Sequence, residues 1–80
     1  MNLERLQLKG MLAESKKKYR ALDTECSGLV LLLRSLLNPY EEVLKLDTEK
    51  ISVSVERLTN AQNEMRELSE KIKKLESEFE

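Results

Sequence analysis

The chain has 80 residues, of which 40% are hydrophobic and 36% charged, and its formal net charge is −1. This length predicts one small domain over residues 1–80, and two glycines with one proline are typical of long helices rather than of a sandwich or barrel. The balanced charge excludes a strong overall attraction to nucleic acid or anionic lipid, and the lack of histidine removes the commonest catalytic base and metal ligand.

A regular pattern with steps of four and three residues runs through the first half of the chain. It predicts a helix over residues 3–37 that presents one stripe, or seam, to a partner helix. Only Ser15 among the seam positions is plainly polar, and Cys26 is interpreted as a small buried hydrophobe because Asp23 and Glu25 make an unfavourable setting for a reactive thiol. The seam positions are Leu8, Leu12, Ser15, Tyr19, Leu22, Cys26, Leu29, Leu33 and Leu36.

The dipeptide Asn38-Pro39 ends this helix, because proline clashes with the preceding turn and keeps Asn38 out of the helical region. Asn38 is also a good N-cap, and proline suits the first helical position. We therefore expect a connection over residues 38–47 with a short helix from Pro39 to about Leu44.

A second long helix is predicted over residues 48–78, with Asp47 as its N-cap. One apolar set near its start and another toward its end do not join at regular spacing, because two successive steps of three residues meet near Asn60. Such a stammer is expected to overwind the helix locally. The first set is Ile51, Val55 and Leu58, and the second is Ala61, Met65, Leu68, Ile72, Leu75 and Phe79.

Two helices of similar length joined by a short connection predict an all-α fold, an antiparallel hairpin resembling a coiled coil. Charge supports this: residues 1–37 carry seven basic and four acidic side chains, and residues 38–80 carry seven basic and eleven acidic ones.

Folding the chain back on itself is expected to bring its one basic cluster beside glutamates of the second helix. The cluster is Lys16, Lys17, Lys18 and Arg20, and the glutamates are Glu64, Glu67 and Glu70. We favour this pairing, and nucleic-acid contact by the same four basic residues, with Tyr19 stacking on a base, is the alternative.

Apolar side chains exceed what one partner helix can cover at the connection end of the hairpin. The predicted protein interface consists of Val30, Leu31, Leu32, Leu37 and Tyr40. A second copy covering these residues gives a homodimeric four-helix bundle, and a different protein is the alternative occupant.

No pattern in the chain predicts catalysis, cofactor binding or a metal site. A single cysteine cannot build a thiolate zinc site, and there is no phosphate-binding glycine loop. The longest apolar run is shorter than the roughly 20 residues of a membrane span, and the start lacks a secretory pattern. We therefore expect a cytoplasmic protein that is not an enzyme and has no cofactor, membrane or small-molecule partner.

The stretch Leu36-Leu37-Asn38-Pro39-Tyr40, followed by Val43, Leu46-Asp47 and Leu75-Glu76, resembles a group of small uncharacterised helical proteins of Mu-like prophages. The resemblance implies a phage accessory protein in a bacterial host and transfers no site residues. The sequence thus favours a self-associating helical module that binds protein. A nucleic-acid-associated factor and a small helical chaperone are the alternatives.

Overall fold

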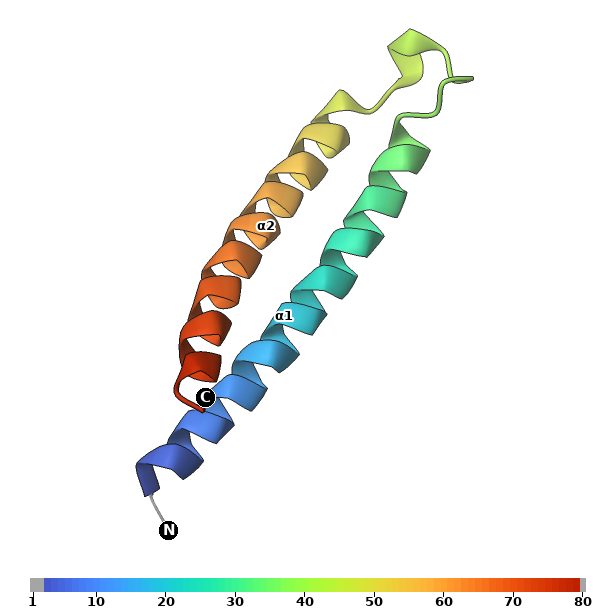
Figure 1. Ribbon diagram of the computed structural model, residues 1–80. Coiled ribbons are helices and arrows are strands. Elements are labelled where there is room, and N and C mark those ends of the chain that lie inside the picture. Colours follow the sequence, from blue (N-terminus) through green and yellow to red (C-terminus); the bar gives the residue numbers. More distant parts are fainter. Residues whose placement is uncertain (1–2, 80) are drawn as a thin grey trace.

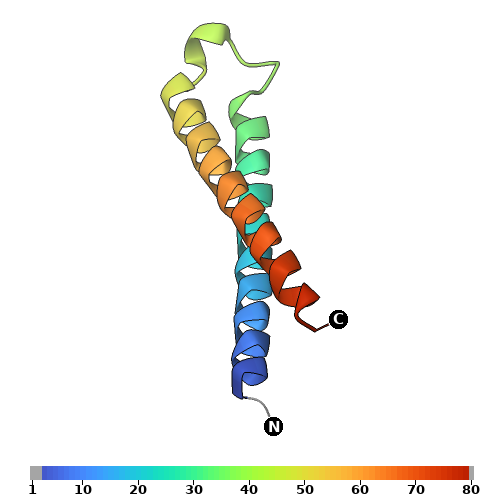
Figure 2. The ribbon, with the colours of Figure 1, turned by 60° about the vertical axis from the view of Figure 1, so that its left-hand side comes forward.

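The computed structural model describes residues 3–79, which form an elongated hairpin of two long helices measuring 64 × 16 × 14 Å. Helix α1 spans Leu3–Leu36 and helix α2 spans Thr48–Ser77, and between them lies one 3₁₀ turn, η1, at Val43–Lys45. The two helices run antiparallel along their length (Figure 1) and cross at an angle in the second view (Figure 2). The predicted all-α hairpin is confirmed, and each long helix ends within one residue of its predicted end.

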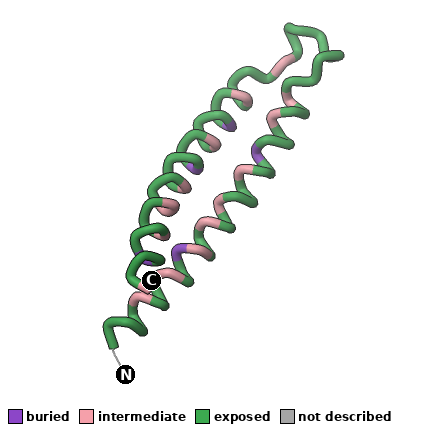
Figure 3. The backbone as a smooth tube through the Cα atoms, in the orientation of Figure 1, coloured by how far each residue is buried: buried purple, intermediate pink, exposed green. Residues whose placement is uncertain are grey.

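The seam predicted for the first half of the chain is the face that α1 turns toward α2. All nine predicted positions are buried or half-buried, and the rest of α1, apart from Lys16, is exposed. The shielded positions of each helix follow the line that faces the other helix in Figure 3. Spacing of four and three residues therefore identified the packed face of α1, including the polar position Ser15.

The seam of α2 differs from the prediction at one position, and this difference removes the stammer. Ser54 is buried and Val55 is exposed, so the contacts continue through Ile51, Ser54, Leu58 and Ala61 in regular steps of three and four. The Ser54 hydroxyl donates a hydrogen bond to the Lys50 carbonyl oxygen, 2.8 Å away, which allows a small polar side chain to be buried there. The predicted stammer is thus wrong, and α2 is continuous.

The connection forms a turn where a short helix from Pro39 was expected. The Asn38 side-chain oxygen accepts a hydrogen bond from the Tyr40 N–H at 3.0 Å, and the Asn38 carbonyl accepts from Glu41 at 3.1 Å. Asn38 thus closes a local turn with its own side chain, and the chain is extended again at Glu42 before η1 begins. The short helix of the connection therefore begins later than predicted, at Val43.

Helix α2 begins at the predicted cap. The Asp47 carboxylate accepts a hydrogen bond from the Lys50 N–H at 3.0 Å, and the Asp47 carbonyl accepts from Ile51 at 3.0 Å. At the other end of the hairpin, the Arg5 guanidinium lies over the Phe79 ring, 5.5 Å from its centroid. These contacts define both ends of the packed region.

Candidate interaction surface

The five residues predicted as a protein interface do not form one patch. Val30, Leu31 and Leu37 lie along one flank of α1, and all are exposed. Leu32 lies on the opposite flank, because it is spaced by whole heptads from Lys18 and Met11, which line a hollow on that side. Tyr40 is 95% exposed in the connection and does not cover the end of the hairpin.

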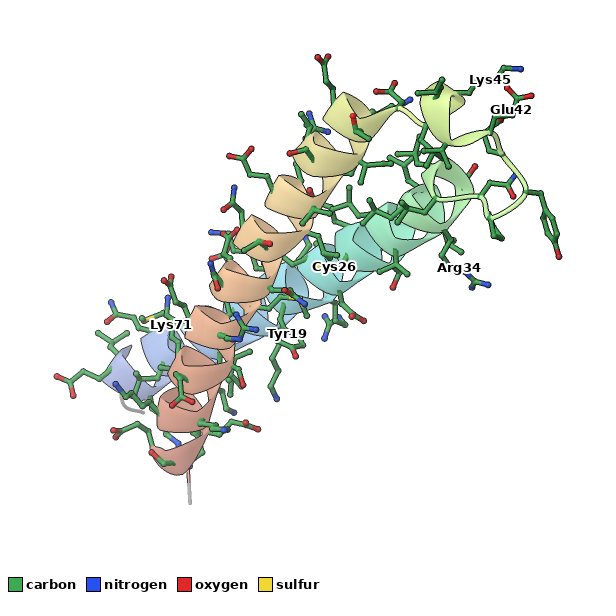
Figure 4. The ribbon with its side chains drawn as sticks, turned by 90° about the horizontal axis from the view of Figure 1, so that it is seen from above. Tyr19, Cys26, Arg34, Glu42, Lys45 and Lys71 are labelled. Atoms are coloured by element: carbon green, nitrogen blue, oxygen red, sulfur yellow. The ribbon has the colours of Figure 1, made fainter. Side chains whose placement is uncertain are left out.

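A shallow surface groove of about 630 Å³ lies between the two helices on the flank that carries Val30. Its apolar lining consists of Cys26, Val30, Leu31, Leu58 and Met65, and we call it the Val30 groove. The Cys26 thiol contacts the Met65 sulfur at 3.8 Å across the seam. Figure 4 shows Cys26 where the two helices face each other. Cys26 is therefore half-buried at the base of a groove, rather than fully buried as predicted.

The Val30 groove continues toward the connection. Val30 also lines a second hollow, with Leu33, Leu37 and Pro39, so the apolar surface extends along the last turns of α1. Arg34 borders this hollow, and its side chain points away from α2 in Figure 4. The result is one apolar strip on a single flank, running from the middle of the hairpin to its connection.

Helix α2 contributes to this strip in a way that the sequence pattern does not predict. Leu58 and Met65 are seam positions, and each also lines the Val30 groove. Val55, which was assigned to the seam, is exposed two turns before Gln62, a lining residue, and so shares that flank. The signal that could have found this strip is an apolar residue that directly follows a seam residue in the sequence, as Val30 follows Leu29 and Val55 follows Ser54. Such residues lie at the edge of a two-helix contact.

Two opposite charges border the Val30 groove at the end away from the connection. Asp23 comes from α1 and Arg66 from α2. The Arg66 guanidinium donates a hydrogen bond of 2.8 Å to the Asn63 side-chain oxygen on its own helix. The groove is therefore mainly apolar, with Ser27 and Gln62 also in its lining and one acidic and one basic side chain at its far border.

The basic cluster is dispersed around α1 instead of forming one charged face. Lys16 forms an ion pair with Glu76, at 3.5 Å, on the flank of the Val30 groove. Lys17 and Lys18 line the hollow on the opposite flank together with Lys71. Tyr19, the proposed stacking residue of the nucleic-acid alternative, is half-buried at a seam position (Figure 4). No single surface therefore presents all four cations together.

The acidic partners predicted for this cluster are wrong. Residue 16 lies level with residue 76, so Glu64 lies level with about residue 28, because both helices rise equally per residue. Within the described chain, Lys16 is the member of the cluster that forms an ion pair, and Glu70 pairs with Lys73 on α2 at 3.8 Å. Charge asymmetry between the halves thus indicated the hairpin and not its register.

Within residues 3–79, no group of three or more histidine, cysteine or acidic side chains is arranged to hold a metal ion. Neither α1 nor α2 combines the length and apolar character needed to cross a bilayer. Searches against known protein families, characterised proteins and solved structures find nothing similar to this chain.

Proposed function

We propose that this chain is a non-enzymatic helical interaction module that self-associates, and that its working form is a homodimeric four-helix bundle. The observation that carries the proposal is the apolar strip along the Val30 groove and the connection, which the hairpin leaves in contact with water. Surface patches of this kind mark sites where proteins bind one another.

The small core of the hairpin supports this proposal. Among residues 3–79, only Leu29, Ala61 and Leu75 are buried apolar residues, and no large side chain is fully buried. Two helices can shield only one stripe of each other. Helices that are isolated in water are marginally stable, so those of a protein depend on packing against other elements. A second hairpin laid against the first would bury a further face of each helix, as four-helix bundles do.

Sedimentation equilibrium over a wide range of protein concentrations tests the proposal. The expected result is a mass near twice the 9.3 kDa of one chain, with dissociation on dilution. A mass of 9.3 kDa throughout, with full helix content by circular dichroism, would contradict self-association.

A chaperone-like role is the second candidate, and the observation that favours it is the exposure of the connection, where Leu44 is 98% exposed. If this role is correct, the protein should suppress the aggregation of an unfolding model protein, and the Leu44→Ser variant should not. Equal suppression by the unchanged chain and the variant would count against the role. A phage or prophage origin, suggested by the sequence resemblance, stays a prediction.

A further inference from the structure

We propose that the Val30 groove is where the second copy docks, groove against groove, with the two connections at the same end of the bundle. This inference rests on the proposed self-association and names the surface and orientation that bring it about. In this arrangement, a two-fold axis along the hairpin places α1 of each copy beside α2 of the other.

The exposed area of one chain matches what a stable dimer needs. The hairpin exposes 6666 Å², whereas a compact monomer of 9.3 kDa is expected to expose about 5,000 Å². The excess of about 1,700 Å² lies within the share that each subunit buries in an obligate homodimer, roughly 1,000–2,500 Å². Two chains together expose about 13,300 Å², against about 8,200 Å² expected for a compact protein of twice the mass, so a fully compact dimer would bury about 2,500 Å² of each chain, at the upper end of that range.

The two flanks of the hairpin differ in how many charged side chains a contact with a second copy would bury. The flank of the Val30 groove carries the apolar residues Val30, Leu37 and Val55. Arg34 is the charged residue that lies among them. The opposite flank also has apolar residues near the connection, namely Leu32 and Val53. There they alternate with charged side chains, among them Glu25, Lys50 and Arg57. Burying the second flank would desolvate more charge for less apolar area.

The distribution of apolar and charged residues along the groove flank favours connections at the same end. On this flank the exposed apolar residues Val30, Leu37 and Val55 lie toward the connection, whereas Lys16, Arg20, Lys73 and Glu76 lie toward the other end. With the connections together, the apolar halves face each other. With the connections apart, a full-length overlap would place Val30 and Leu37 against the charged half of the partner.

The same orientation pairs the charges that border the groove. Asp23 and Arg66 line one groove from different helices and so lie at a similar height. A two-fold axis along the hairpin places Asp23 opposite Arg66 of the partner subunit, and the symmetry repeats this pair. Complementary charges at the border of an apolar contact fix its register and orientation.

A matched pair of substitutions on α1 tests the surface. Val30→Glu should raise the dimer dissociation constant about tenfold or more, because the contact would have to desolvate a carboxylate in place of an apolar side chain. Leu32→Glu introduces the same group two residues away, where exposure is 36% instead of 44%, and should leave the dissociation constant nearly unchanged. Circular dichroism of both variants checks that they keep their helices.

Charge reversal tests the register. Asp23→Arg should weaken the dimer, and adding Arg66→Asp should restore it, with dissociation constants measured by sedimentation. Failure of the double variant to recover any affinity would overturn this pairing.

Spin labels test the orientation. With Cys26→Ala removing the native thiol, Glu42→Cys provides one labelling site in the connection, which Figure 4 shows at the tip of the hairpin. Connections at the same end predict a label-to-label distance similar to the width of the bundle, and connections at opposite ends predict one approaching the 64 Å length.

These outcomes separate the two proposals. A stable monomer in sedimentation would overturn both self-association and this surface. A dimer that Leu32→Glu weakens as much as Val30→Glu does, or one with a long label-to-label distance, would overturn the inference and leave self-association intact.

Discussion

Ser15 and Ser54 are each only 4% exposed, which makes these two serines as well shielded as any apolar residue of the seam. The Ser54 hydroxyl is satisfied by the carbonyl of the preceding turn, a bond that costs a helix little and often slightly destabilises it. Small side chains suit a narrow two-helix seam because neighbouring leucines can close over them. The shielding of these positions therefore follows from size and spacing more than from hydropathy.

Ser54→Ala should raise the free energy of unfolding by about 0.5 kcal/mol, because alanine has the higher helix propensity and no hydroxyl to bury. Ser52→Ala, at an exposed position of the same helix, should give a similar gain from propensity alone. Urea denaturation of both variants measures the difference. A clear loss of stability in Ser54→Ala alone would show that the hydroxyl helps to hold the seam.

Leu75→Ala should lower the free energy of unfolding by about 2 kcal/mol, near the lower end of the range for core leucines, because a thin seam can partly close over the cavity. Leu75 is 7% exposed, and the matched control Leu44→Ala removes the same atoms from a fully exposed position. That control should change stability by less than about 0.5 kcal/mol. Equal losses in thermal and urea denaturation would contradict the described core.

At the scale of elements, the sequence was sufficient to predict both long helices and the seam of α1, because strict spacing and the proline act locally. It was insufficient for Ser54, since hydropathy favoured Val55 and the cost of burying a hydroxyl depends on a hydrogen bond within the helix. The division of the predicted interface into two flanks was also missed. Sequence spacing separates Leu31 from Leu32 by about 100°, but which flank holds a groove depends on the packing of α2.

The start of α2 offers a direct test of a local signal. Asp47→Ala should lower the free energy of unfolding by about 1 kcal/mol, because the Lys50 N–H would lose its side-chain acceptor. Asp47→Asn keeps an acceptor of similar geometry and should retain most of the stability. Denaturation followed by far-ultraviolet circular dichroism measures both. Equal stability of Asp47→Ala and the unchanged protein would show that the cap is not needed to start this helix.

At the scale of the whole molecule, residues 3–79 form a rod 64 Å long and 14–16 Å wide, which within that range has no interior site remote from solvent. Its exposed surface is therefore where function is to be sought, and its two chemically distinct candidates are the apolar strip and the dispersed basic side chains. Only the strip is continuous, as it joins two hollows through Val30.

Duplex DNA should not bind with useful affinity at physiological salt. Consecutive lysines point about 100° apart around a helix, so at most two of Lys16, Lys17 and Lys18 can follow one phosphate strand. Each neutralised phosphate contributes close to one unit to the salt slope, and we expect a slope below about 2. A titration at two salt concentrations measures it.

The variant with Lys16, Lys17 and Lys18 each changed to Glu serves as the control for that titration. Tight binding by the unchanged protein that weakens steeply with salt and vanishes in the variant would favour the nucleic-acid alternative over the apolar strip.

Both described ends of the chain, Leu3 and Phe79, belong to the same end of the hairpin, opposite the connection (Figure 1). A mechanical pull applied between them would load the contacts between the helices one layer after another, as in opening a zipper, instead of shearing them all together. Each layer holds only a few side chains, so separation would proceed stepwise from the Arg5–Phe79 contact toward Asn38. Thermal unfolding of the hairpin therefore has to break the contacts between the helices together, whereas a force applied at its open end breaks them in small steps.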